Sequence, residues 1–170
     1  DTIGGQSGDI ARTAWLAAGL PDHVPGTTID RQCGSSQQAV HFAAQAVMSG
    51  TSDLIVAGGV QQMSTIPISS AMLVGEQFGY PDPFTGSTGW QERYGDQEVS
   101  QFRSAQMIAD KWDCSRDEME AFAVESHERA IRARDSGRFD AEIAPLGDVA
   151  RDEGPREPHW EKSRRLTPLE

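Results

Sequence analysis

The chain has 170 residues, a length that suits one domain or slightly more and excludes a large multidomain assembly. It is 37% hydrophobic and 24% charged, so it carries enough apolar material to form a folded core. Its 15 basic and 26 acidic residues give a formal net charge of −11, which argues against binding to nucleic acid or to an anionic membrane surface. Any anionic ligand must therefore be held by local basic groups.

Neither a membrane segment nor a metal site is expected. The longest apolar run, Leu54 to Val60, contains two glycines and is too short to cross a bilayer, and no charged-then-apolar leader opens the chain. The two cysteines, Cys33 and Cys114, show neither CxxC nor Cys/His ligand spacing, which argues against a disulfide framework or a structural zinc site. We therefore expect a reducing, cytoplasmic compartment.

The first third of the chain predicts alternating helices and strands. Ser7 or Asp9 can cap the first helix, and Gly19 and Gly50 can end the two helices. The second strand is a continuous apolar run, which is typical of a strand buried on both faces. This order indicates a layered α/β unit. The predicted elements are a helix over residues 10–18, a strand over 24–29, a helix over 34–49 and a strand over 54–57.

The rest of the chain has a different residue pattern. Residues 64–98 are punctuated by glycine and proline without a lasting period, which predicts a long loop with a binding or lid role. Two amphipathic helices should follow and pack together, one over residues 99–112 and one opened by a capping box at residues 115–118 and stopped at Gly137.

Cys33 stands between a predicted strand and a helix rich in small residues. A thiol at that place faces the positive end of the helix dipole, which favours the nucleophilic thiolate, and Gly34 leaves room for a substrate. The alanine-rich face of the helix would allow close burial. A lone cysteine is also commonly a small buried hydrophobe, so spacing alone leaves both interpretations open. Acidic neighbours oppose a thiolate at Cys114.

Residues 27–39, Thr-Thr-Ile-Asp-Arg-Gln-Cys-Gly-Ser-Ser-Gln-Gln-Ala, closely resemble the nucleophile segment of the thiolase family. Further segments resemble family landmarks in the family's order along nearly the whole chain. Residues 53–64 resemble the family's strand with a Gly-Gly…Met-Ser turn, and residues 104–109 resemble the start of a helix in its covering loop domain. Residues 152–156 resemble the family's segment near the CoA nucleotide, and two further landmarks match residues 115–118 and 137–143. The resemblance implies a thiolase-like layered α/β half-domain over residues 1–63 and an inserted, mainly helical loop domain over residues 64–170.

Acyl transfer through a cysteine thioester is the chemistry that this resemblance implies. Cys33 would attack the keto carbon of a 3-ketoacyl-CoA, release acetyl-CoA and pass the acyl group to a second CoA, and the reverse reaction is a Claisen condensation. The backbone amide of Cys33 would be one oxyanion donor. Coenzyme A or acyl-CoA is then a substrate, with no permanently bound cofactor.

Basic residues of the tail are the candidates for CoA contacts, since residues 151–170 carry five basic and five acidic side chains. Arg156 is favoured by motif position, and Lys162, Arg164 and Arg165 are weaker candidates; a solvated charged tail is the alternative. Ser100 and Gln101 stand where biosynthetic members have a His-Met pair lining the pantetheine tunnel, which points to a broader or longer-chain thiolase.

Other positions leave alternatives open. The family often has Asn at the place of Asp30 and glycine at the place of Ser36. The aromatic residues of the loop domain could line an acyl channel or fill its small core. They are Trp90, Tyr94 and Phe102.

The sequence contains no Gly-His-Pro, Asn-Glu-Ala or late Cys-x-Gly motif, each of which family members need for catalysis. Surface or packing roles are expected for its four histidines, which are His23, His41, His127 and His159. We therefore expect an internal portion of a longer thiolase, an incomplete catalyst by itself, from a homodimeric or homotetrameric enzyme of fatty-acid or sterol side-chain degradation. The alternatives are a non-enzymatic CoA-binding or assembly module and a ketoacyl-synthase-like condensing enzyme, although the latter lacks this loop domain.

Overall fold

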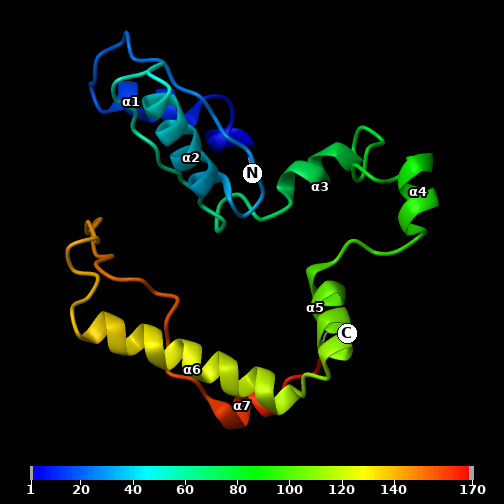
Figure 1. Cartoon of the computed structure of the whole chain (residues 1–170). Coiled ribbons are helices and arrows are strands. Elements are labelled where there is room, and N and C mark those ends of the chain that lie inside the picture. Colours follow the sequence, from blue (N-terminus) through cyan, green and yellow to red (C-terminus); the bar gives the residue numbers. More distant parts are fainter. Residues whose placement is uncertain (1, 169–170) are drawn as a thin grey trace. The chain divides into compact units, whose positions relative to one another are not determined.

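The structure is a computed structural model that describes residues 2–168 (Figure 1). The chain divides into two compact units, Asp1–Gly95 and Asp96–Glu170. The first unit contains a 3₁₀ helix, η1 (Gly4–Gln6), and the helices α1 (Ile10–Ala17), α2 (Ser35–Met48), α3 (Ser70–Glu76) and α4 (Thr88–Tyr94). The second unit contains α5 (Gln101–Trp112), α6 (Arg116–Asp135) and α7 (Trp160–Arg164). The domain boundary expected after residue 63 stays a prediction.

Helix α1 begins and ends as its sequence predicts. The Asp9 carboxylate accepts a hydrogen bond from the Arg12 amide at 3.1 Å and caps the first turn. The Arg12 guanidinium in turn donates to the carbonyl oxygens of Asp22 and Val24, which ties the following loop to the helix. Gly19, just past the end, has a left-handed backbone with φ of 74°.

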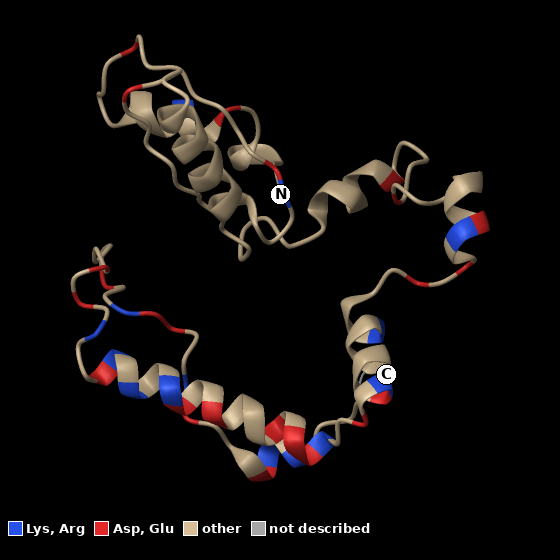
Figure 2. Ribbon diagram, in the orientation of Figure 1, with Lys and Arg blue, Asp and Glu red and all other residues tan. Residues whose placement is uncertain are grey.

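Helix α2 also matches its prediction, and Gly50 follows it with φ of 73°. The expected close burial of its alanine face is wrong for this structure, because none of its residues is buried within the described part of the chain. Figure 2 shows no Lys, Arg, Asp or Glu in α2, and several of its large apolar residues are exposed, among them Phe42 and Met48.

The two predicted strands do not form. Residues 2–168 contain no β-strand, and their single β-bridge joins Leu146 to Val149. In the segment expected to be fully buried, Leu54 is 86% exposed and Val56 is 76% exposed. A strand requires a neighbouring strand for its backbone N–H and C=O groups, and none lies beside either segment among the described residues. The layered α/β arrangement is therefore not seen in this structure.

The segment over residues 64–98 is more regular than expected, because it includes α3 and α4. Before α4, the Asp82 carboxylate accepts hydrogen bonds from the amides of Phe84 and Thr85, both at 2.7 Å, and from the Thr85 hydroxyl at 2.6 Å. Trp90 of α4 then packs between Phe84 and Tyr94, with ring centroids 4.3 and 4.6 Å away. Hydrogen bonds from side chains thus order residues 64–98, although their glycines and prolines interrupt the hydrophobic period from which helices are predicted.

Helix α6 has the predicted capping box at Ser115 and Glu118 and the predicted stop at Gly137, whose φ is 72°. The helix that packs along it is α7. Arg116 of α6 donates to the carbonyl oxygens of Ser163 at 3.0 Å and Leu166 at 2.8 Å, which holds the end of the α7 segment against the start of α6.

Very little of the chain is buried. Ala109, 7% exposed, is the one buried apolar residue among those described. The described helices include none with the length and apolar character needed to span a membrane. Secondary structure in this chain is consequently held by local caps and turns more than by a core.

Candidate active site

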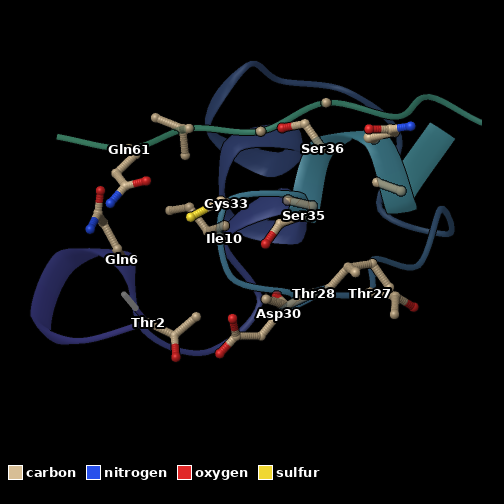
Figure 3. Close-up of a pocket in the computed structure, with 17 residues that line it drawn as sticks. Thr2, Gln6, Ile10, Thr27, Thr28, Asp30, Cys33, Ser35, Ser36 and Gln61 are labelled. Carbon is tan, nitrogen blue, oxygen red and sulfur yellow. The ribbon is translucent and has the colours of Figure 1, made fainter. Parts of the chain in front are cut away.

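A cavity of about 380 Å³ lies in the first unit, and Cys33 is in its wall. It is formed by parts of η1 and α1, the 27–30 segment, the first turns of α2 and the 58–61 segment (Figure 3). Asp30 is the one charged side chain among its described lining residues, and no cation lines it. The cavity therefore suits an uncharged chain or a carbonyl group better than a phosphate.

Two hydrogen bonds between distant segments assemble the cavity wall. The Gln62 amide donates to the Gln6 side chain at 2.8 Å, which ties the 58–62 segment to η1. The Thr28 hydroxyl donates to the Gly8 carbonyl at 3.0 Å, which ties the 27–30 segment to the start of the chain. The cavity is thus held together by hydrogen bonds between residues as far as 56 positions apart in sequence.

Cys33 is exposed and lies in the turn immediately before α2. Its φ is 61°, a left-handed conformation that is uncommon for a residue with a Cβ. Its backbone amide forms no hydrogen bond within the described residues. A thiol and a free amide on one residue at a helix start can serve as nucleophile and oxyanion donor. The exposure of Cys33 does not fit a buried packing role in this structure.

Ser35 and Arg31 enclose Cys33 in a hydrogen-bonded turn. The Ser35 hydroxyl donates to the Arg31 carbonyl at 2.9 Å and accepts from the Arg31 amide at 3.0 Å. The Gly34 amide donates to the same carbonyl at 2.9 Å. Sequence reasoning missed this pair, although serine hydroxyls often bond backbone groups three or four residues earlier in the chain.

Cys114 occupies a different setting in the second unit. It is exposed, borders a hollow formed by Trp112, Met119 and Phe122, and has the carboxylates of Asp113 and Glu118 in the same wall. Cys114 lies in the turn between α5 and α6 and does not line the cavity that contains Cys33.

The pair predicted to line a pantetheine tunnel lies at the start of α5. The Ser100 hydroxyl accepts from the Arg103 amide at 3.3 Å, so it serves as the cap of this helix. Gln101 follows as the first helical residue and is exposed. Their proposed contact with CoA stays a prediction.

The candidate CoA residues of the tail also lie in the second unit. The Arg156 guanidinium donates to the Gly154 carbonyl at 3.3 Å, and its backbone amide donates to His127 Nδ1 at 3.4 Å. Lys162 is exposed on α7. Arg164 is engaged elsewhere, because it pairs with Asp117 at 3.3 Å and lies over the Trp160 ring at 4.8 Å. The CoA contacts expected of these residues stay predictions.

Comparison with known proteins identifies the family. The model of the thiolase N-terminal domain matches residues 2–165, nearly the whole chain. The chain belongs to the thiolase family. Steroid 3-ketoacyl-CoA thiolase FadA6 of Mycobacterium tuberculosis is 60% identical over 173 residues, which cover 99% of this chain and 42% of that protein.

More distant thiolases match as well. The 3-oxoadipyl-CoA/3-oxo-5,6-dehydrosuberyl-CoA thiolase of Escherichia coli is 34% identical over 81% of this chain and 36% of its own length. A probable acetyl-CoA acyltransferase of Staphylococcus aureus is 33% identical over 96% of this chain and 44% of its own length. The thiolase chain described here thus spans less than half the length of these curated relatives.

Proposed function

We propose that this chain is the nucleophile-bearing part of a thiolase that cleaves 3-ketoacyl-CoA esters by thiolysis. The observation that carries the proposal is Cys33, exposed in the cavity wall at the start of α2, within a chain of the thiolase family. The 60% identity to a steroid 3-ketoacyl-CoA thiolase favours acyl groups derived from steroids over acetoacetyl-CoA. Because no positively charged side chain of the described residues lines the cavity, it fits the uncharged acyl end of such a substrate better than the phosphates of CoA.

In the proposed reaction, the Cys33 thiolate attacks the C3 keto carbon, and the carbonyl electrons move to oxygen, where the Cys33 amide can stabilise them. Collapse of this oxyanion breaks the C2–C3 bond, and C2 takes up a proton as acetyl-CoA leaves. The thiolate of a second CoA then attacks the Cys33 thioester and releases the shortened acyl-CoA and the cysteine thiolate. The proton transfers need acid–base groups of the motifs that this sequence does not contain.

CoA recognition is proposed for the second unit. Arg156 and Lys162 supply the positive charge that phosphates require, and Ser100 with Gln101 would contact the pantetheine arm. Arg156 is supported by the ordered turn around it, where the Gly154 amide donates to Asp152 at 2.8 Å and the Arg156 amide bonds His127.

We also propose the architecture and setting of the complete enzyme. With neighbouring strands present, the 24–29 and 54–57 segments would join the sheet of a layered α/β domain, and residues 64–170 would form the loop domain that covers CoA. The large exposed side chains Leu54 and Val56 support this, because a sheet covered on both faces would bury them. A cytoplasmic homodimer or homotetramer acting in lipid degradation is the proposed assembly, without nucleic-acid or membrane partners.

The test uses the complete protein with a 3-ketoacyl-CoA substrate. Cys33→Ala should abolish thiolysis and the acyl adduct that mass spectrometry detects on a tryptic peptide containing residue 33, while Cys114→Ser should retain both. Iodoacetamide should label Cys33 faster than Cys114 at neutral pH, and acetyl-CoA should protect it. Turnover near the wild-type rate in Cys33→Ala would refute the proposal, and CoA binding without any acyl adduct would support a binding module instead.

A further inference from the structure

The turn that contains Cys33 points to a positioning role for the residue two places after it. We propose that the Ser35 hydroxyl holds Cys33 in its left-handed conformation and thereby aims the thiol and the free amide into the cavity. This inference rests on the proposed role of Cys33 as the nucleophile. Figure 3 shows Ser35 and Cys33 together at the cavity.

The hydrogen bonds of the Ser35 hydroxyl connect the backbone before Cys33 to the residue that follows Gly34. Its hydroxyl donates to the Arg31 carbonyl at 2.9 Å and accepts from the Arg31 amide at 3.0 Å. Arg31 precedes Cys33 by two residues and Ser35 follows it by two, so these bonds close a ring that includes the cysteine. The two bonds therefore restrain the backbone on both sides of Cys33.

A second anchor fixes the ring to α2. The Arg31 guanidinium donates to the side-chain oxygen of Gln38, which lies in the first turn of the helix beyond Ser35. The ring is thus attached to the helix whose amino end faces Cys33. A left-handed cysteine costs free energy, so the conformation persists because these contacts hold it.

The hydroxyl of Ser35 acts through Cys33 and does not itself react. Its proton is already donated to Arg31, and it accepts from the amide of the same residue. The amide of Cys33, by contrast, has no acceptor among the described residues. Loss of the ring would therefore misalign the nucleophile and the oxyanion donor together, which lowers the rate of acylation more than the affinity for CoA.

The experiment compares Ser35→Val and Ser35→Thr in the complete protein, two β-branched variants that differ in the hydroxyl. The Val variant should form the acyl–enzyme about tenfold more slowly or worse in single-turnover measurements, with the Kd for CoA within about twofold of wild type. The Thr variant should recover most of the rate. Ser49→Ala is the matched control, since it removes a serine hydroxyl that bonds the Ala46 carbonyl at the other end of α2.

Equal acylation rates in Ser35→Val and Ser35→Thr would overturn the inference. Should the Val variant not fold, Gln38→Leu cuts the second anchor alone and should slow acylation about threefold, and an unchanged rate would overturn the inference equally. An acyl adduct formed by Cys33→Ala would instead refute the proposed function. The two failures are thereby distinguished.

Discussion

Gly59 lies so close to Ser36 that a Cβ atom on this glycine would stand 2.2 Å from the Ser36 hydroxyl oxygen. Both residues line the cavity that contains Cys33. The 58–60 segment and the first turn of α2 therefore meet at a contact where a methyl group would displace the Ser36 hydroxyl.

Gly59→Ala should destabilise the protein by about 1 kcal/mol, because the added methyl forces the Ser36 hydroxyl to rotate away. The double variant Gly59→Ala with Ser36→Gly should regain most of that loss, which a double-mutant cycle of urea unfolding measures. Gly58→Ala is the matched control, since a Cβ at Gly58 would meet nothing within 4 Å. Equal stability of Gly58→Ala and Gly59→Ala would contradict the packing described here.

Arg116→Ala should release α7 from α6. The guanidinium bonds the carbonyls of Ser163 and Leu166 and pairs with Glu120 at 2.7 Å. Its loss should cost about 1–2 kcal/mol and speed amide hydrogen exchange in residues 160–166. Arg129→Ala removes only an exposed pair with Glu125 and should leave that exchange unchanged. Unaltered protection of α7 in Arg116→Ala would show that other contacts hold the tail.

The capping box of α6 should make its stability depend on pH. Hydrogen bonds from the Ser115 hydroxyl and amide hold the pKa of Glu118 below its ordinary value of 4.5. A carboxylate with a depressed pKa stabilises the fold above its unfolded pKa and loses that contribution as the pH falls through its folded pKa. In circular dichroism, wild type should be more helical than Glu118→Gln at pH 7, and the difference should shrink below pH 4.5. A constant difference down to pH 2 would contradict this explanation.

Asp82→Ala should loosen the turn before α4. The carboxylate accepts from the Thr85 hydroxyl and from two amides, which also lowers the pKa of Asp82. Without it, the amides of Phe84 and Thr85 should exchange with solvent about tenfold faster or more, whereas Asp82→Asn should keep partial protection through its carbonyl oxygen. Asp96→Ala serves as a control for the loss of an exposed carboxylate. Full protection in Asp82→Ala would show that the turn is held by other groups.

Local chemistry explains the parts of the fold that were predictable. The start of α1 is specified by Asp9, which caps the first turn of the helix. The start of α6 is specified by the capping box of Ser115 and Glu118. These signals act over three or four residues, so they can be read in order along the chain. The position of Cys33 before a helix was predictable for the same reason, and the likeness of residues 27–39 to a known nucleophile segment indicated the family.

Non-local contacts explain the rest. The strand expected at residues 54–57 depends on a partner strand, and its β-branched residues cannot supply one. Helix α4 follows a turn that the Asp82 carboxylate holds. The many glycines and prolines around it leave no helical period from which this helix could be predicted. The cavity needs Gln6 and Gln62 to meet across 56 positions, which no short-range period encodes.

By itself, the sequence indicated the helices α1, α2, α5 and α6 and the family, and it singled out Cys33 as the candidate nucleophile, because caps, glycines and contiguous motifs act over a few residues. Only the tertiary structure decided that Cys33 takes a left-handed conformation inside a ring closed by Ser35 and Arg31, beside a cavity walled by distant segments. The backbone angle of Cys33 and the wall of the cavity depend on which hydrogen bonds form when the chain folds. Several residue types can form such bonds, so the sequence alone does not specify them.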